Sequence, residues 1–306
     1  MKAYLQRRIL FALIALAGVT VVVSAMLHIS GDPVAVMLQS GMASQAERDA
    51  LRRELGFDKP FVIQYFDFVR GALRGDLGLS LRFRQPALTI VRERLPATFQ
   101  LAAAAMAFAV LVAVPIGVVS AVRPRSLVDY AGRLVTLVGQ SIPLFWLGIM
   151  LVMVFAVRLR WLPSAGKLDA TSLILPAVTL GLYPMARIAR TLRASMFEVL
   201  PHEYCLTARS KGLSEHLVVI RHALPNALLP VVTVIGLQFG ALLGGAVVTE
   251  TIFAWPGLGW LSVQAVQARD FPLVRAIVAV VSMLLIFINL LTDVLYAYLN
   301  PRIRLG

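Results

Sequence analysis

Six segments of this chain are long or apolar enough to cross a bilayer, which takes about 20 residues of helix. A single segment in hydrocarbon satisfies its backbone polar groups only as a helix, so we predict helical spans. They lie near residues 9–29, 98–122, 133–157, 172–190, 227–249 and 274–298. The fourth is short and contains Pro176, Gly181 and Pro184, which predicts a kinked helix surrounded by protein. The predicted fold class is an all-α integral membrane protein with about six transmembrane helices.

Composition agrees with a membrane protein. The 306 residues are 59% hydrophobic, with a mean hydropathy of +0.80, whereas soluble domains are about 45–50% apolar. The net charge of +13 would indicate nucleic acid only if the cations clustered on one solvated domain, but they flank the apolar runs. We therefore expect membrane lipid and no nucleic acid as a partner. The single cysteine, Cys205, excludes an intrachain disulfide and a multi-thiolate metal site.

The first apolar stretch has two interpretations. Lys2, Arg7 and Arg8 precede it, as in a cleaved signal peptide. The hydrophobic region of a signal peptide is about 7–15 residues long, and the run from Ile9 to Leu27 is longer than that. We favour a retained transmembrane anchor.

Cations in short loops set the orientation. With the N-terminus inside, fourteen lysines and arginines fall on the cytoplasmic side and five in the opposite short loops. The segment from about 30 to 97 carries ten more, but it is too long for the rule to apply. We expect both termini in the cytoplasm.

A charged insert between Pro201 and Pro230 interrupts the apolar pattern. We predict a helix from Glu203 to Lys211, ended by Gly212, which adopts a left-handed backbone without a Cβ clash. Ser214 is a predicted N-cap of a second helix that continues until Pro225, with Leu213 packed on Val218. By itself this hairpin could merely join two spans.

The particular residues of the insert favour a more specific role. The segment resembles the coupling loop of bacterial ABC importer permeases, whose pattern is Glu-Ala-Ala, three residues, Gly, nine residues, Ile, one residue, Leu-Pro. Here Ala208, Gly212, Leu224 and Pro225 match, whereas Leu206 stands in place of the glutamate, Thr207 in place of an alanine and His222 in place of the isoleucine. The insert is similar to the variant of the peptide and nickel subgroup. The resemblance extends to GDLGLS at 75–80, RLPATFQLA at 94–102, LPAVTLGL at 175–182, FAWPGLG at 253–259, RDFPLV at 269–274 and DVLYAYLNPRIR at 293–304.

The resemblance implies a type I importer permease in the bacterial inner membrane. It implies a second homologous permease subunit, two cytoplasmic ATPase subunits and a periplasmic substrate-binding protein as partners. The implied division is an anchor (1–30), a periplasmic segment (31–95), a transmembrane domain (96–300, coupling loop 197–226) and a cytoplasmic tail (301–306). The residues implied to couple to the ATPase are Glu203, Thr207, Ala208, Arg209, Lys211, Gly212, Leu213, Leu224 and Pro225. A bulky acid at Gly212 is expected to abolish transport while leaving membrane insertion intact.

The chain has no phosphate-binding G-x-x-x-x-G-K-[ST] loop and no H-E-x-x-H zinc motif. We therefore predict a transport subunit rather than an enzyme, with no cofactor of its own, and with ATP and Mg bound by the ATPase subunits. The four histidines are scattered at loop or span edges and are predicted to be interfacial or solvated.

Polar residues within the spans are candidates for the translocation pathway, because a polar group in hydrocarbon is costly and by default functional. They are Gln140, Ser141, Gln238 and Asn289. Gly236, Gly240 and Gly244 recur every four residues and predict close helix packing, either within this chain or toward the partner or the pathway. The resemblance implies that the loop with Trp255, Trp260 and Arg269 contacts the binding protein. Alternatively, the two tryptophans lie in the aromatic belt at the membrane–water interface.

The substrate that the resemblance implies is a short peptide or peptide-like solute. Glutathione and a nickel–ligand complex are alternatives within the same architecture. A secondary transporter or channel is the alternative of another class; it would need a paired charge at mid-membrane, whereas Asp293 lies near a span edge.

Overall fold

The computed structural model describes residues 2–29, 45–54 and 56–299. Within these ranges the chain is helical, and the strand-like pairing is confined to an isolated antiparallel bridge between Leu79 and Pro86. The predicted tail, 301–306, lies outside the described residues. The chain forms two compact units, Met1–Thr98 with Pro256–Phe287, and Phe99–Trp255 with Ile288–Gly306.

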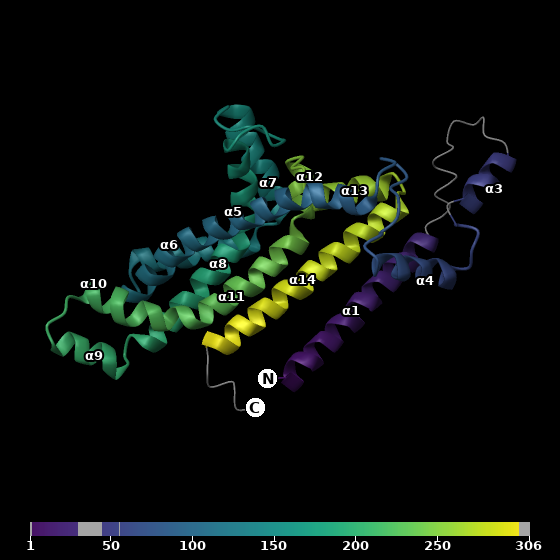
Figure 1. Cartoon of the computed structure of the whole chain (residues 1–306). Coiled ribbons are helices and arrows are strands. Elements are labelled where there is room, and N and C mark those ends of the chain that lie inside the picture. Colours follow the sequence, from purple (N-terminus) through teal and green to yellow (C-terminus); the bar gives the residue numbers. More distant parts are fainter. Residues whose placement is uncertain (1, 30–44, 55, 300–306) are drawn as a thin grey trace. The chain divides into compact units, whose positions relative to one another are not determined.

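The first unit joins two segments that are distant in sequence. Its helices are α1 (Lys2–Ile29), α3 (Gln45–Glu54), α4 (Phe61–Ala72), the first turns of α5 (Ala87–Val122), α13 (Leu258–Gln267) and most of α14 (Phe271–Leu299) (Figure 1). The predicted external segment therefore shares a core with the loop and helix start that follow residue 255.

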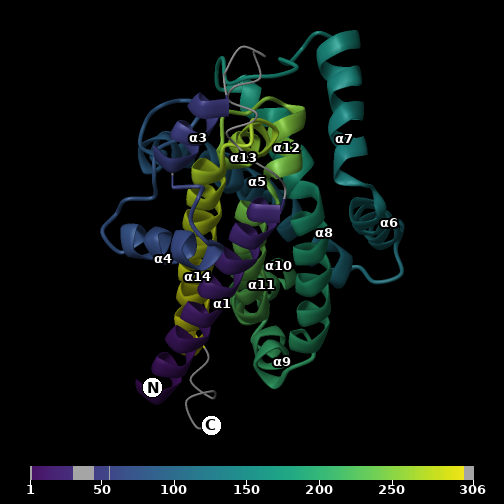
Figure 2. The same cartoon turned by 90° about the vertical axis from the view of Figure 1, so that its right-hand side faces the viewer.

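The second unit contains the insert. Its elements are the rest of α5, α6 (Leu127–Ser141), α7 (Leu144–Leu151), the π-helix η1 (Val152–Arg158), the 3-10 turn η2 (Thr171–Leu173), α8 (Ile174–Val199), α9 (Glu203–Ser210), α10 (Glu215–Leu217), the π-helix η3 (Val218–Ala223), α11 (Leu224–Gly245), α12 (Val247–Ile252) and the end of α14. In Figure 2, α8 leads from the side of α7 down to α9.

Five of the six predicted spans are confirmed as helices long and apolar enough to cross a membrane. The third predicted span, 133–157, coincides with a bent pair of helices, in which α6 meets the following helix at 106° (Figure 2). The break falls at Ile142, which is extended (φ −75°, ψ 125°) before Pro143. A proline disfavours the helical conformation of the residue before it and donates no N–H, which explains the break.

The fourth predicted span is helix α8, and the prediction that protein surrounds it is confirmed. About two thirds (67%) of its apolar window is buried, a larger share than in the other described spans. Pro184 lies inside the helix, and Gly181 packs so closely on the Ala105 carbonyl that a Cβ would collide with it. Neighbouring helices thus supply the packing that stabilises a helix of low mean hydropathy.

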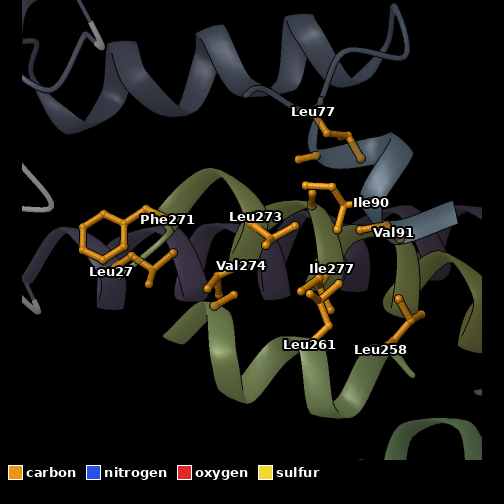
Figure 3. Packing of buried hydrophobic residues seen from close by; sticks show 13 residues of the cluster. Leu27, Leu77, Ile90, Val91, Leu258, Leu261, Phe271, Leu273, Val274 and Ile277 are labelled. Carbon is orange, nitrogen blue, oxygen red and sulfur yellow. The ribbon is translucent and has the colours of Figure 1, made fainter. Parts of the chain in front are cut away.

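One hydrophobic cluster forms the core of the first unit. Figure 3 shows Leu27 of α1, Leu77, and Ile90 and Val91 of α5 gathered around the α13 and α14 side chains. Apolar residues from five separate parts of the sequence meet here, so the external segment is anchored rather than independent.

A buried carboxylate fixes the start of α14. Asp270 accepts hydrogen bonds from the Leu273 N–H (3.2 Å), the Arg82 N–H (3.1 Å) and the Ser80 hydroxyl. The first of these is an N-cap bond of α14, and the other two join the RDFPLV and GDLGLS segments. Two motifs 190 residues apart therefore form one structural unit.

We predict that Asp270→Ala destabilises the first unit by roughly 1–3 kcal/mol, because three donors lose their acceptor in a buried place. The measurement is the thermal midpoint of the purified protein. Asp58→Asn is the control, because Asp58 is exposed and makes no side-chain hydrogen bond in the described part of the chain. Equal midpoints for the two variants would contradict this role of Asp270.

Candidate functional site

The insert begins with α9, as predicted. The helix runs from Glu203 to Ser210, one residue short of the predicted end. Its inner face is small and apolar: Cys205 is fully buried and Ala208 is buried, and burial raises the pKa of the Cys205 thiol. Ala208 therefore packs against its own chain in this structure instead of presenting a surface to a partner.

Gly212 ends α9 in the predicted left-handed conformation, with φ of +80°. The Gly212 N–H bonds to the Arg209 carbonyl and the Leu213 N–H to the Ala208 carbonyl, the arrangement of a Schellman motif. A Cβ at Gly212 would meet nothing within 4 Å, so the backbone angle, and not crowding within this chain, is what requires glycine.

The second helix of the insert begins where predicted but does not end there. Ser214 occupies the N-cap position, but its side chain makes no capping hydrogen bond. The helix does not stop at Pro225; α10, η3 and α11 run on from Glu215 to Gly245. The π-helical turn widens the helix at carbonyls that the proline ring would otherwise crowd, which lets the helix continue.

Arg209 ties three elements together. Its Nε and NH2 donate to the two carboxylate oxygens of Glu215 at 2.9 and 2.7 Å, and its NH1 donates to the Leu200 carbonyl at 3.2 Å. The Glu215 hydrogen bond raises the pKa of the guanidinium. Within this chain the Arg209 guanidinium therefore joins the end of α8 to the start of α10.

The outer face of the insert remains open. Lys211 is exposed, and Leu206 and Tyr204 expose 51% and 39% of their surface. Leu217 and Ile220 are exposed to a similar extent. Glu203 and Thr207 are also exposed, and Leu213 and Leu224 are half-buried. A water-exposed helical hairpin that displays large apolar side chains beside a cation has the composition of a protein-binding surface.

Of the predicted pathway residues, Gln238 lines a cavity of about 260 Å³ between α6, α7, α8 and α11. Its side chain is buried among mostly apolar neighbours, with Thr179 and Tyr183 on the same wall. The Thr179 hydroxyl already donates a hydrogen bond to the Leu175 carbonyl. Few polar groups thus remain to contact a solute in this cavity.

The other predicted pathway residues lie elsewhere. Gln140 lines a separate cavity between α5, α6 and α8. Ser141 is exposed and donates to the Leu137 carbonyl, and Asn289 is exposed on α14. The structure therefore does not bring Gln140 and Gln238 to one cavity, although the sequence predicted a shared role.

The glycines of α11 divide by position. A Cβ on Gly236 would lie 2.6 Å from Cγ2 of Thr292 on α14, whereas one on Gly240 would make ordinary contacts of 3.4 Å and more with α14. Gly244 is exposed. Of the two alternatives, packing within the chain accounts for Gly236 and Gly240.

The predicted contacts to a binding protein separate in the same way. Trp255 is fully buried, and the Lys167 ammonium lies 5.5 Å from its ring centroid. In this structure no surface of the Trp255 side chain is accessible to a partner. Trp260 is half-buried and Arg269 is exposed, so Arg269 remains accessible to a partner.

Sequence reasoning missed an ion cluster at the start of α6. Asp129 is buried and accepts from Arg193 (2.9 Å to Nε, 3.2 Å to NH2) and from Arg133 (2.8 Å). The spacing of Asp129 and Arg133 is the i,i+4 signal of a helical pair and could have been recognised. The contact with Arg193, 64 residues away, had no local signal.

The chain matches two family models. Residues 113–305 match "Binding-protein-dependent transport system inner membrane component", and residues 1–102 match "Binding-prot-dependent transport system membrane comp, N-term".

Curated relatives match over nearly the whole chain. The dipeptide transport system permease protein DppB of Escherichia coli (strain K12) is 41% identical, with 99% of each chain covered. The glutathione transport system permease protein GsiC of Pectobacterium atrosepticum is 43% identical, again with 99% of each covered. Among solved structures, an inward-facing MetNI methionine ABC transporter chain superposes with a TM-score of 0.59 at 19% identity, over 69% of this chain and 96% of that one. The fold is thus that of type I ABC importer permeases.

We predict that Gly236→Ala lowers the thermal midpoint of the protein whereas Gly240→Ala does not. Alanine gains up to about 1 kcal/mol over glycine in a helix interior at either site. At Gly236 the collision with Thr292 adds an overpacking cost of about 1–3 kcal/mol, which outweighs the gain. Equal effects of the two substitutions would show that α11 and α14 do not pack at Gly236.

Proposed function

Because the chain belongs to the family of binding-protein-dependent transport system inner membrane components, we propose that it is the permease subunit of an ATP-driven importer of short peptides. It forms half of the translocation pathway in the inner membrane, and a second homologous permease forms the other half. A periplasmic binding protein delivers the solute. Two cytoplasmic ATPase subunits bind ATP and Mg, and both termini of this chain lie in the cytoplasm.

The observation that carries the proposal is the open outer face of the insert. Leu206 and Tyr204 expose apolar surface next to Lys211, while Cys205 and Ala208 anchor the same helix from within. We propose that the ATPase receives α9 in a groove. The exposed leucine is an anchor of the kind that carries binding energy at interfaces, and Lys211 pairs with an acidic rim.

Force passes from α9 to the spans through contacts within this chain. The Arg209 fork holds Glu215 and the end of α8 at once, so a displacement of α9 moves both neighbouring helices. The continuous run from α10 into α11 then carries the displacement to the cavity lined by Gln238. We propose that this cavity is opened alternately to the two sides of the membrane. On the periplasmic side, Trp260 and Arg269 are the residues proposed to contact the binding protein.

The peptide substrate is proposed from the DppB relatives, and glutathione is the second candidate, supported by the similarity to GsiC. The family assignment replaces a secondary transporter or channel as the explanation of the membrane spans.

We predict that Leu206→Ser abolishes ATP-driven uptake of a labelled dipeptide by the reconstituted importer and releases the ATPase subunits during purification. Loss of a buried leucine contact costs about 1.5–3 kcal/mol, which weakens binding by roughly tenfold or more. Leu73→Ser is the matched control, because Leu73 is 85% exposed and lies outside the insert. Normal uptake by Leu206→Ser would exclude α9 as the docking helix.

The substrate class is tested by competition. In the same proteoliposomes, we expect an excess of unlabelled dipeptides to suppress uptake of the labelled dipeptide, and glutathione to compete weakly. Stronger competition by glutathione would assign the importer to the second candidate while leaving the coupling mechanism intact.

A further inference from the structure

A second cavity of about 330 Å³ lies between α5, α6 and α8, apart from the one lined by Gln238. Three arginines, Arg133, Arg190 and Arg193, contribute to its lining, and Ser120 adds a hydroxyl. Three guanidinium groups around one cavity concentrate positive charge there, which indicates a site for an anion.

The charges of this cavity do not balance. The Asp129 carboxylate neutralises part of the charge of Arg133 and Arg193, with which it makes ion pairs of 2.8 and 2.9 Å. Arg190 makes no ion pair with any described residue. One carboxylate therefore pairs with two of the three cations, and the surplus positive charge attracts an anion.

The position of the cavity is that of a membrane surface. Helix α5 ends at Val122 and α6 begins at Leu127, so Ser120 and Arg133 lie within about two turns of these ends. Lipid phosphates lie at this boundary, and basic pockets between spans are known to bind anionic headgroups.

The walls favour a lipid over a free ion. Leu137 belongs to the cavity and also exposes 65% of its surface on the outer face of α6, next to exposed Leu134 and Val138. An apolar surface therefore leads directly from the arginines to the part of the helix that faces lipid tails. A phospholipid uses both surfaces, whereas inorganic phosphate uses only the cationic one.

We propose that this cavity binds the phosphate group of an anionic phospholipid, with Arg190 as the residue that contacts it and Arg133 and Arg193 held in place by Asp129. The bound headgroup joins α6 and α8 at the membrane surface. This site is separate from the docking face of α9 and from the Gln238 cavity.

The test measures lipid retained by the whole purified importer in native mass spectrometry, after exchange into phosphatidylglycerol or phosphatidylcholine. We expect phosphatidylglycerol to be retained and phosphatidylcholine to be lost. Arg190→Gln is expected to reduce retention of phosphatidylglycerol about tenfold, the effect of losing a hydrogen bond to a charged group. Arg190→Lys, which keeps the charge, is expected to preserve most of it.

The control is Arg187→Gln, an exposed cation on the same helix that does not line the cavity. All variants are compared as intact complexes after gel filtration, so a folding defect is seen separately. Equal retention of the two lipids, or equal loss in Arg187→Gln and Arg190→Gln, would overturn the proposal. Displacement of phosphatidylglycerol by inorganic phosphate at about millimolar concentration would overturn the lipid as occupant and assign a soluble anion to the site, since a lipid anchored by its tails resists such competition.

Discussion

Hydrocarbon offers no partner to a backbone N–H or carbonyl, and this constraint decides where each helix of the chain begins, bends and ends. The ends are the places where side chains supply the missing partners. Asp270 caps α14 and binds the GDLGLS segment; Asp129 receives two arginines at the start of α6; Arg209 closes the carbonyl end of α8 and the carboxylate of α10. These charged groups thus lie at helix ends, and two of them, Asp270 and Asp129, join segments that are distant in sequence.

The same arrangement explains how a short helix can act on long ones. By itself an eight-residue helix is marginal in water. Here α9 is stabilised by burying Cys205 and Ala208 and by the glycine turn at Gly212. Because the buried face is committed to the chain, the helix presents its other face as a rigid surface. A force on that surface is carried by the Arg209 fork, and not absorbed by a flexible loop.

Much of this organisation could be predicted from the sequence, because it depends on local chemistry. Five spans followed from apolar length, and Gly212 followed from the need for a left-handed residue after α9. The break at Pro143 was missed because hydropathy is averaged over a window of residues and carries no information on the direction of the helix axis. The burial of Trp255 was missed for another reason, because it depends on which distant segments cover the side chain. The pairing of Arg209 was missed because it depends on how the turn at Gly212 folds α10 back onto α9. The ion pair of Asp129 and Arg193 is the clearest such contact, since no sequence pattern near either residue predicts the other as its partner.

The two cavities of the second unit have opposite chemistry, and this contrast bears on specificity. The Gln238 cavity has mainly apolar walls, and the Thr179 hydroxyl on its wall already donates to the Leu175 carbonyl of the same helix. A pathway with few fixed donors and acceptors leaves few groups unpaired when the solute changes, so it discriminates weakly between side chains. Such a surface suits short peptides, whose side chains vary while their backbone does not. Selection then has to occur before the solute reaches this chain, which is consistent with delivery by a separate binding protein. The arginine-lined cavity, in contrast, carries a fixed positive charge. Such a charge suits a ligand that always carries a phosphate, such as the proposed phospholipid, and not a solute whose side chains vary.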